Sequence, residues 1–369
     1  MFLTDFCLYF MANQSFPPKF RQFSRLLLKW DKEENNRAMP WKGEKDPYRI
    51  WISEIILQQT RVDQGLAYYQ KFIKNFTRIE DLANATDEKV FKIWEGLGYY
   101  TRCRNLLSTA RFISKSLNGK FPSNYTDILE LKGVGPYTAA AISSFAFNLP
   151  YAVIDGNVFR VLSRLTGISE PIDSTEGKKI FSSLANEWLD KKQPGKYNQA
   201  IMDFGASVCK PQSPLCEDCP FRSVCFAFQN GRIPELPVKT KKQKLKSRYF
   251  YYFILNYKKE KAVRLRDKKD IWQGLYEFPL IEMPAPAGID ELLDIAEKNK
   301  WLKKGKYKLL SVSVNYKQLL SHQKLEGQFI EISLKQPPDI ENLKWVSPAL
   351  MKKLAFPRFI NKYLEINLQ

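Results

Sequence analysis

The chain has 369 residues, of which 44% are hydrophobic and 26% charged, and it carries a formal net charge of +19. This length is sufficient for two domains, each with its own core. A basic surplus of this size indicates a polyanionic partner, with nucleic acid ranked ahead of an acidic membrane surface. No apolar run in the sequence reaches membrane-spanning length, which argues against an integral membrane protein.

The N-terminal segment MFLTDFCLYFM is apolar but does not have the pattern of a signal peptide. It lacks a basic leading region, contains Asp5 and has no small-residue cleavage site. We interpret residues 1–17 as a poorly ordered tail, with Met11 as an alternative start. A reducing, cytoplasmic location is therefore expected. In that reducing compartment the six cysteines are expected to be thiols or metal ligands rather than disulfides.

From Phe20 to about Gly231 the pattern is helical, because apolar residues recur at spacings of three and four and Gly or Pro marks the turns. Helices are predicted over residues 48–59, 62–76, 87–95, 103–117, 136–147 and 176–190. The stretch from Ile233 to Arg248 is basic and contains two prolines. It is interpreted either as a solvated linker or as an extended strap along DNA phosphates.

After Arg248 the chain is rich in β-branched and aromatic residues, which predicts a mixed α/β domain of about 120 residues. Strands are predicted over residues 249–257, 262–266, 308–316 and 325–334, and helices over 289–299 and 348–364. The predicted organisation is a tail at 1–17, a helical domain at 18–231, a basic linker at 232–247 and an α/β domain at 248–369.

Four cysteines lie within 17 positions, with gaps of six, two and five residues between them: Cys209, Cys216, Cys219 and Cys225. Three prolines among them suit a compact loop around a metal centre. Four thiolates form a tetrahedral zinc site, and they hold a four-iron cluster equally well. The spacing alone therefore predicts metal binding and leaves the two metals open.

The segment LKGVGPYT at residues 131–138 predicts a tight turn between two helices. Gly133 and Gly135 permit a left-handed turn, and Pro136 is placed to begin the second helix. The backbone N–H groups of such a turn can bind a DNA phosphate without reading the base sequence. A plain helix–turn–helix corner is the alternative, and Lys132 with the positive net charge favours DNA.

Glu54 is the only acid on the predicted helix 48–59. Its neighbours three and four residues away include no basic side chain: they are Ile50, Trp51, Leu57 and Gln58. A carboxyl with apolar neighbours has a raised pKa, which suits it to donate a proton. The alternative is a solvated helix stripe, which would normally carry other charged side chains.

Asp155 follows the apolar run 151–154 and precedes a predicted helix at residues 158–166. Asp is a preferred N-cap, so a purely structural role is the alternative here. Backbone donors and the helix dipole are expected to hold this carboxylate ionised. A protonated acid paired with a charged one is what cleavage of a glycosidic bond requires.

Several longer motifs accompany these residues: PW at 40–41, SEIILQQTRV at 53–62, GLGYYTR at 96–102, GVGPYTAAAI at 133–142, VIDGNVFRVLSR at 153–164 and WQGLYEFP at 272–279. With the cysteine spacing, they resemble the helix–hairpin–helix DNA glycosylase superfamily, and specifically the adenine DNA glycosylase (MutY) family. The resemblance covers about residues 20–369. It implies an all-α glycosylase domain whose cysteine loop holds one [4Fe-4S] cluster, and an α/β Nudix-like domain.

The resemblance also implies roles for individual residues. Glu54 would protonate the adenine ring, Asp155 would stabilise the developing sugar cation, and Tyr137 would lie beside the reacting sugar. Endonuclease III-like relatives carry a lysine at the position of Tyr137, so no lysine-based strand cleavage is expected here. The adenine pocket is implied at Arg37, Trp41 and Gln199, the last where glutamate is common in the family. Contacts to the opposite base are implied at Gln58, Gln59, Thr60, Leu97 and Tyr99.

The C-terminal half is similar to the family's Nudix-like domain, which recognises 8-oxoguanine opposite adenine. It lacks the glutamate-rich Nudix hydrolase signature, so it is expected to bind rather than hydrolyse. The family's recognition loop typically reads Phe-Ser-His, whereas here it reads Leu320-Ser321-His322. The missing Phe puts the strength of 8-oxoguanine discrimination in question.

The expected function is excision of adenine opposite 8-oxoguanine or guanine in double-stranded DNA, by a monomer that does not bind membranes. The resemblance also implies a bacterial, nucleoid-associated location in the cytoplasm. Two alternatives remain. An endonuclease III-type pyrimidine glycosylase with lyase activity would keep the fold and change the substrate. A non-catalytic DNA-binding scaffold would hold zinc with the same four cysteines.

Overall fold

A computed structural model of the chain describes residues 22–240, 245–267, 269–338 and 340–367. The predicted tail at 1–17, the start at Met11 and part of the predicted linker lie outside the described residues. The described residues form two compact units, one of residues 22–65 with 112–240 and the other of residues 66–111 with the described part of 245–367. The second unit therefore joins a central helical segment to the C-terminal α/β region. The boundaries at residues 231 and 248 stay predictions.

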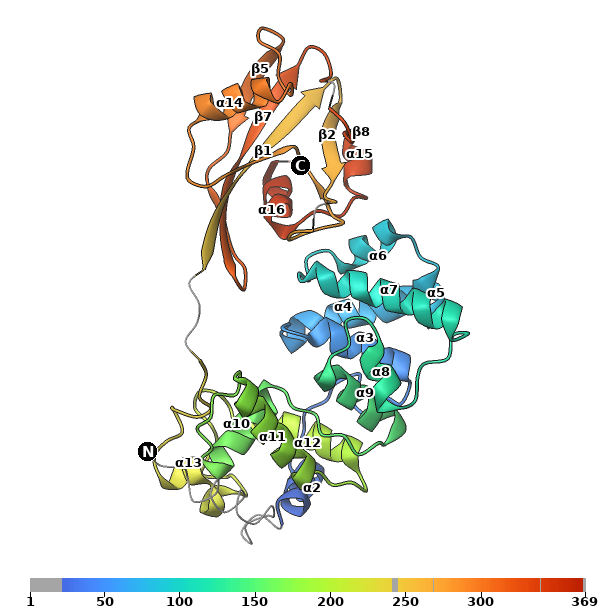
Figure 1. Cartoon of the computed structure of the whole chain (residues 1–369), viewed down its shortest axis with the longest axis vertical. Coiled ribbons are helices and arrows are strands. Elements are labelled where there is room, and N and C mark those ends of the chain that lie inside the picture. The colour runs from blue at the N-terminus through green and yellow to red at the C-terminus, as the bar shows by residue number, and fades with distance from the viewer. Residues whose placement is uncertain (1–21, 241–244, 268, 339, 368–369) are drawn as a thin grey trace. The chain divides into compact units, whose positions relative to one another are not determined.

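The first unit is helical among its described residues, as the apolar periodicity predicts. Its elements are α2 (Phe23–Glu33), α3 (Pro47–Leu57), α8 (Tyr125–Glu130), α9 (Pro136–Phe147), α10 (Gly156–Thr166), α11 (Thr175–Trp188), α12 (Pro194–Ser207), the short 3₁₀ helix η2 (Arg222–Val224) and α13 (Phe226–Gln229) (Figure 1). Helix α9 matches its predicted range, and α3 and α11 match theirs to within two residues.

Helix α3 is buried on nearly every side, with every residue from Ile50 to Ile56 buried. Asp46 caps its N-terminus by accepting a hydrogen bond from the Tyr48 N–H, and Pro47 occupies the first turn, where its missing N–H costs nothing. A helix that is apolar all round belongs in a core. The single acid on this helix is therefore carried into the protein interior.

Helix α10 is amphipathic, and its apolar face, with Val158, Val161 and Leu162, packs in a core shared with α2, α11 and α12. Aromatic rings fill much of that core. The Phe23 ring centroid lies 4.7 Å from that of Trp188 and 4.8 Å from that of Phe221. This packing fixes the position of α10 and hence of the cap residue at its N-terminus.

Helices α8 and α9 are joined by a tight turn, which confirms the predicted hairpin. Gly133 has φ 84°, a left-handed conformation that favours glycine, and the Val134 N–H donates to the Leu131 carbonyl at 3.0 Å. Gly135 is the N-cap of α9 and Pro136 occupies its first turn. Lys132 is exposed at this turn.

The second unit begins with four helices from the middle of the chain. They are α4 (Val62–Asn75), α5 (Ile79–Ala83), α6 (Asp87–Trp94) and α7 (Tyr100–Ser116), of which α4 and α7 cross the division between the units. Phe72, Phe76 and Trp94 pack edge to face in this segment. None of the described helices is long and apolar enough to cross a membrane.

The C-terminal region of the second unit is built on a mixed sheet. Its strands are β1 (Lys246–Tyr257), β2 (Glu260–Leu265), β3 (Tyr276–Glu277), β4 (Leu280–Met283), β5 (Tyr307–Val312), β6 (Tyr316–Leu319), β7 (Gln323–Leu334) and β8 (Lys344–Val346). The main order is β3-β2-β1-β7-β5, and β1 pairs with β7 in parallel. β4 also pairs with β1, β6 with β7, and β8 with β2.

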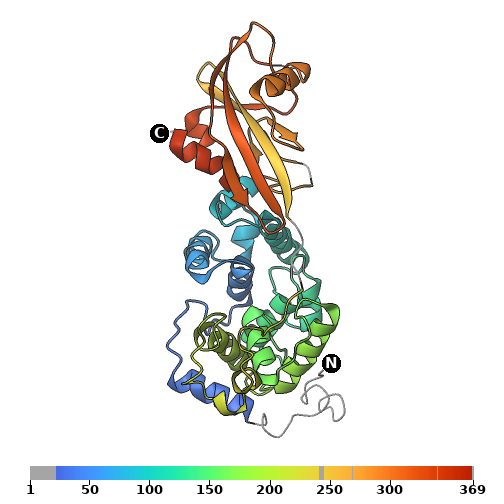
Figure 2. The same cartoon turned by 90° about the vertical axis from the view of Figure 1, so that its left-hand side faces the viewer.

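Alternating side chains of β1 face two different helices. Tyr251, Phe253 and Leu255 share a core with α14 (Ile289–Lys298). On the other face the Tyr252 ring lies 6.2 Å from that of Phe359 in α16 (Arg358–Asn367). Figure 2 shows α14 and α16 on opposite sides of the sheet. This three-layer arrangement confirms the predicted α/β class of the C-terminal half.

The predicted bounds of two elements in this half are wrong. The predicted strand 308–316 is interrupted between β5 and β6, where the side chains of Ser313 and Asn315 accept the N–H groups of Phe329 and Gly327 in place of the strand ladder. The predicted helix 348–364 is two helices, α15 (Pro348–Met351) and α16. Pro357 precedes α16, and a proline disfavours helical backbone at the residue before it.

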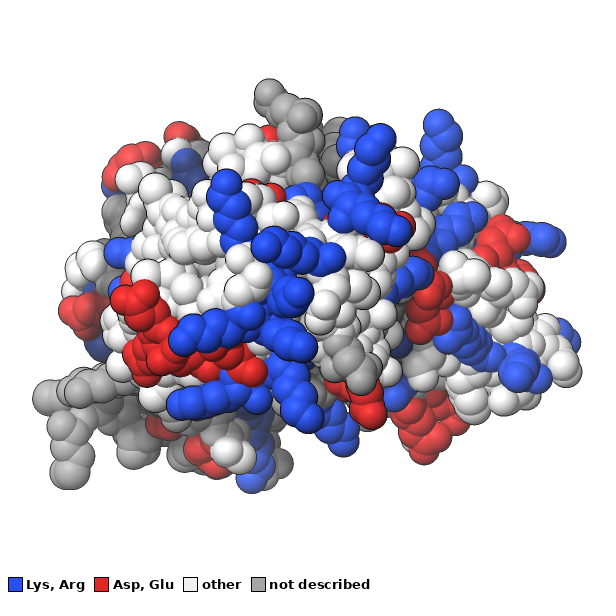
Figure 3. All heavy atoms as spheres, turned by 90° about the horizontal axis from the view of Figure 1, so that it is seen from above, with Lys and Arg blue, Asp and Glu red and all other residues white. Residues whose placement is uncertain are grey.

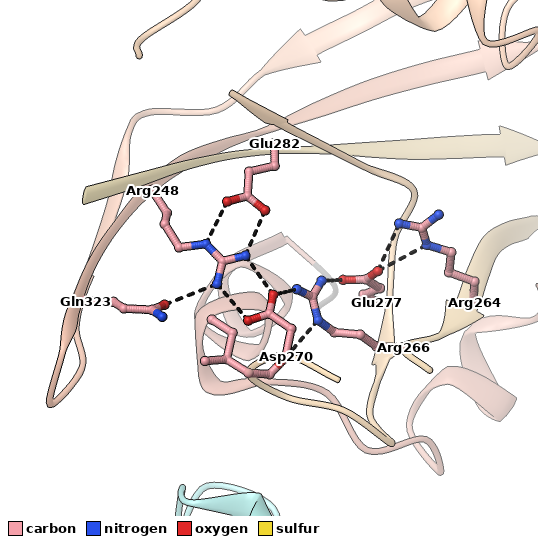
Figure 4. A network of polar contacts seen from close by, with 8 residues as sticks. Arg248, Arg264, Arg266, Asp270, Glu277, Glu282 and Gln323 are labelled. Carbon is pink, nitrogen blue, oxygen red and sulfur yellow. Dashed lines mark hydrogen bonds and ion pairs between the residues drawn. The ribbon is translucent and has the colours of Figure 1, made fainter. Parts of the chain in front are cut away.

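A network of arginines and carboxylates ties the strands of this sheet together (Figure 4). Arg248 of β1 donates to Asp270 and to Glu282 of β4, and Arg266 donates to Asp270 and to Glu277 of β3. The hydrogen bonds from Arg248 hold the pKa of Asp270 far below its ordinary value. The network therefore anchors the loop before the WQGLYEFP motif.

Candidate active site

A cavity of about 360 Å³ opens in the first unit. Its volume falls in the range typical of small-molecule sites. It brings together seven of the residues singled out in the sequence: Arg37, Trp41, Glu54, Thr60, Tyr137, Asp155 and Gln199. These residues come from α3 and the turn after it, α9, α12, the N-terminus of α10 and the segment between α2 and α3.

Glu54 is the buried acid of this cavity, with only 7% of its surface exposed. Burial raises its pKa from an ordinary 4.5 to about 7. A hydrogen bond from the Tyr137 hydroxyl opposes this shift, and the nearby charge of Asp155 adds to it. The prediction of a carboxyl that retains its proton near neutral pH is consistent with this environment.

Asp155 is the N-cap of α10, as its position in the sequence predicts. Its Oδ1 accepts the N–H groups of Asn157 and Val158, both at 2.8 Å, and its Oδ2 accepts the Asn157 Nδ2 at 2.7 Å. Burial nevertheless raises the pKa of Asp155, because desolvation outweighs the lowering by these donors. The net shift is therefore opposite to the one that a helix cap alone predicts.

The two carboxyls still differ in how their charge is supported. Asp155 receives three N–H donors, which stabilise its ionised form. Glu54 accepts a hydrogen bond from the Tyr137 hydroxyl and is buried on an apolar helix. Of the pair, Glu54 is the one better suited to carry a proton and Asp155 the one better suited to be the anion.

Tyr137 links the hairpin to the acids, since it is the second residue of α9. Its hydroxyl lies 3.7 Å from the Met202 sulfur and also hydrogen-bonds with Glu54. Burial raises its pKa well above 10, and both carboxylates add to the effect. The phenol is therefore neutral at physiological pH.

Asp203 is a site residue that the sequence reasoning missed. It is fully buried on α12, and it accepts hydrogen bonds from Arg37 at 2.7 Å and from Asn35 and Lys42 at 3.1 Å each. This carboxylate fixes the segment that carries Arg37 and Trp41 into the cavity. The signal was present in the sequence: like Glu54, Asp203 is an acid in an apolar helical stretch, IMDFG.

The end of α3 holds three predicted opposite-base residues. Gln58 donates through Nε2 to the Thr138 hydroxyl at 3.2 Å, which connects α3 to α9. Gln59 has φ 54°, an uncommon backbone conformation for a residue other than glycine. Thr60 lines the cavity. The tight turn at Gly133 and Gly135 lies in this same unit.

The remaining predicted contacts lie in the second unit. Leu97 is 5% exposed, whereas Tyr99 is 44% exposed and has φ 48°. Leu320, Ser321 and His322 form the turn between β6 and β7, with Ser321 and His322 exposed. The Tyr99 hydroxyl lies 2.9 Å from the Ser321 hydroxyl. The structure thus brings together two residues that are 222 positions apart in the sequence.

The four cysteines of the predicted metal loop lie close to one another. Burial raises the pKa of the Cys219 thiol to about 12, and the other three cysteines contribute to that shift. In residues 22–367, apart from the gaps at 241–244, 268 and 339, no group of three or more His, Cys, Asp or Glu side chains is placed to hold a metal ion. The raised pKa of Cys219 thus shows that the four thiols are near neighbours.

Helix α10 connects the cysteine loop to the acid site. Arg160 donates to the Cys209 carbonyl at 2.7 Å and to the Asn157 side chain at 2.7 Å. Arg164 donates to the Lys210 carbonyl at 2.7 Å and to the Pro211 carbonyl at 3.1 Å. The helix that presents Asp155 therefore also holds the backbone of the cysteine loop.

Family models match both halves of the chain. Residues 52–187 match the HhH-GPD superfamily of base excision DNA repair proteins, and residues 250–366 match the NUDIX domain. Among solved structures, a thermostable thymine-DNA glycosylase is 30% identical, with a TM-score of 0.53, over 57% of this chain and 97% of that one. An endonuclease III–DNA complex, 22% identical with a TM-score of 0.50 over 58% of this chain and 99% of that one, shows likeness of fold.

Two adenine DNA glycosylases resemble the chain over most of their length. That of Buchnera aphidicola subsp. Baizongia pistaciae is 35% identical over 301 residues, which cover 81% of this chain and 83% of the relative. That of Buchnera aphidicola subsp. Acyrthosiphon pisum is 32% identical over 93% of this chain and 97% of the relative. With the buried acid, the hairpin and the cysteine loop in place, these relatives show that the chain belongs to the adenine DNA glycosylase family of the HhH-GPD superfamily.

Proposed function

We propose that the chain hydrolyses the N-glycosidic bond of adenine mispaired with 8-oxoguanine or guanine in duplex DNA, and that it does not cut the strand. The proposal rests on one observation: Glu54 is a buried carboxyl with a pKa near 7, and it shares one cavity with Asp155 and Tyr137. Family membership makes adenine the base that is excised.

The mechanism follows from the different environments of the two acids. The target base must leave the helix stack to reach a buried group, which costs roughly a few kcal/mol. Glu54 donates its proton to the adenine ring, so that a neutral base departs. Asp155, held by three N–H donors, stabilises the positive charge that develops on the sugar. Glu54, now ionised, takes a proton from the attacking water.

The adenine itself would lie against Arg37, Trp41 and Gln199. All three line the cavity, and Asp203 holds the Arg37 guanidinium in place. Trp41 supplies an aromatic surface on which a purine can stack. Gln199 offers both a donor and an acceptor, as adenine does on its Watson–Crick edge.

DNA binding would use charge and backbone groups. Lysine and arginine side chains are prominent on the face shown in Figure 3, with smaller acidic groups among them. The turn at Gly133 and Gly135 precedes α9, and a helix N-terminus favours a phosphate. Gln58, Gln59 and Thr60 would contact the opposite base from the end of α3.

The second unit would recognise the opposite base through Leu97, Tyr99, Ser321 and His322. The C-terminal region is proposed to bind rather than hydrolyse. Asp270, Glu277 and Glu282 of its ionic network are each engaged by an arginine, which leaves them poorly suited to hold a catalytic cation (Figure 4).

The test is the identity of the products. The native chain should release free adenine from duplexes that hold it opposite 8-oxoguanine or guanine, more slowly opposite thymine, and leave an uncut strand. Release of a pyrimidine instead would favour the endonuclease III-type alternative. Efficient borohydride trapping on abasic DNA would do the same, because trapping requires a Schiff base with a lysine.

The cysteine loop would hold one [4Fe-4S] cluster through Cys209, Cys216, Cys219 and Cys225. A four-iron cluster takes one thiolate per iron, whereas a zinc site needs all four on one atom. The four thiols are near neighbours, since the other three cysteines contribute to the raised pKa of Cys219, and membership of the adenine DNA glycosylase family favours the iron cluster over zinc. When bound, the cluster would cross-link the loop that Arg160 and Arg164 hold.

Metal analysis tests this assignment. The purified protein should contain about four irons per chain and absorb visible light. A colourless protein that contains zinc and no iron would contradict the cluster and would support the scaffold alternative.

A further inference from the structure

Glu95 follows the last residue of α6, and its carboxylate reaches into the C-terminal region of the second unit. Its Oε1 accepts the Phe356 N–H at 2.8 Å and the Asn361 Nδ2 at 3.0 Å. Its Oε2 accepts the Lys92 Nζ at 2.5 Å, and the same Lys92 nitrogen donates to the Leu354 carbonyl at 2.8 Å. The Glu95 side chain is only 16% exposed.

The contact to Phe356 satisfies a backbone donor that no helix uses. Phe356 precedes Pro357 and lies between α15 and α16, so helix bonds cannot use its N–H. Hydrogen bonds to a charged group are about twice as strong as neutral ones. Glu95 and Lys92 together therefore form a polar clamp between α6 and the segment 354–361.

The residues next to the clamp are those proposed to read the opposite base. The Glu95 carbonyl accepts the Tyr68 hydroxyl at 2.6 Å, which holds the start of the turn 96–99. The Trp94 Nε1 donates to the Gly98 carbonyl at 2.9 Å. The turn ends at Tyr99, whose hydroxyl lies 2.9 Å from that of Ser321.

A second contact holds the same helices to the same region. The Arg104 guanidinium, on α7, donates to the Gln273 carbonyl. At the neighbouring Gly274, a Cβ would come within 3.1 Å of the Phe91 ring of α6. Contacts with the C-terminal region therefore flank the turn 96–99 in sequence, one at Glu95 before it and one at Arg104 after it.

We propose that Glu95 is a positioning residue that holds the turn 96–99 against the C-terminal region, and that it thereby sets the preference for 8-oxoguanine over guanine opposite adenine. The proposal rests on the proposed function, in which Tyr99 and Ser321 contact the opposite base. Breaking the clamp lets Tyr99 and Ser321 separate, while the acids that cleave the bond belong to the other unit.

The experiment compares single-turnover adenine release opposite 8-oxoguanine and opposite guanine, in the full chain. Glu95→Ala should lower the ratio of the two rates by about 10-fold, within the usual range of coupling between sites. Glu95→Gln keeps an oxygen that can accept from Phe356 and Asn361, so it should restore much of the ratio. Glu88→Ala, an exposed residue on the same helix, should leave the ratio unchanged.

The outcomes separate this proposal from the proposed function. If the native chain releases no adenine from either duplex, the function itself fails. If the native chain discriminates and Glu95→Ala discriminates equally, the clamp has no role in recognition. Equal loss of both rates would show a merely structural role and would also overturn the proposal. Asn361→Leu removes one donor while Glu95 stays, and should lower the ratio in the same direction if Glu95→Ala fails to fold.

Discussion

Replacing Glu54 with glutamine is expected to lower the single-turnover rate of adenine release by about 10²–10⁴-fold, the usual contribution of general acid catalysis. Glutamine has nearly the same shape but no acidic proton. Burial raises the pKa of Glu54 to about 7, so the native carboxyl is substantially protonated at neutral pH. The variant loses that proton source while the cavity keeps its form.

Measuring the DNA affinity of Glu54→Gln shows whether the substitution impairs the chemical step or the binding of DNA. Glu54→Gln should bind a duplex with adenine opposite 8-oxoguanine as tightly as the native chain does. The matched control is Glu33→Gln, because Glu33 is an exposed acid on α2 whose partner is Lys29. Full activity in Glu54→Gln would reject Glu54 as the acid, and weakened binding with an unchanged rate constant would make its role structural.

Replacing Asp155 with asparagine is expected to lower the same rate by about 10²–10³-fold, the cost of removing one electrostatic group that stabilises a transition state. Asparagine is as good an N-cap as aspartate, so α10 should keep its start. Its Oδ1 can still accept the N–H groups of Asn157 and Val158. What the variant loses is the negative charge.

Thermal unfolding and activity together decide between the two roles of Asp155. If it acts as an anion, Asp155→Asn should unfold near the native temperature and excise slowly. The control is Asp290→Asn, which removes a charge from the first turn of α14. A variant that is destabilised yet fully active per folded molecule would leave Asp155 with a capping role alone.

The parts of the site that could be predicted from sequence are those that depend on local pattern. Glu54 could be recognised because its own helix provides no basic neighbour, and α3 is buried almost throughout. The turn at Gly133 needs a left-handed residue, and its position before Pro136 marks the start of a helix. Asp155 could be placed as an N-cap by residue type and position alone.

What could not be predicted depends on tertiary packing. The pKa of Asp155 rises because the folded chain excludes water from it, and no local pattern reports that desolvation. Asp203 gains its partners from residues more than 150 positions away. The break between β5 and β6 depends on side chains that replace backbone hydrogen bonds across to β7.

The packing of residues 66–111 with the C-terminal region also depends on tertiary contacts. The sequence of α6 predicts a helix like the others in the helical half of the chain. It does not show that Lys92 and Glu95 bind the backbone of residues 354 and 356. Those partners are more than 250 positions away. Their distance in sequence is why no local pattern reports that residues 66–111 group with the C-terminal region.

The pH dependence of the native single-turnover rate tests most directly whether a protonated Glu54 drives release of the base. With saturating enzyme and adenine opposite 8-oxoguanine, the rate constant should be level on the acid side. As the pH rises, the rate constant should fall with an apparent pKa near 7. Well above that pKa, the decrease should approach about tenfold per pH unit. This fall should be absent from the residual rate of Glu54→Gln. A native rate constant that stays flat from about pH 6 to about pH 9 would contradict proton donation by this carboxyl.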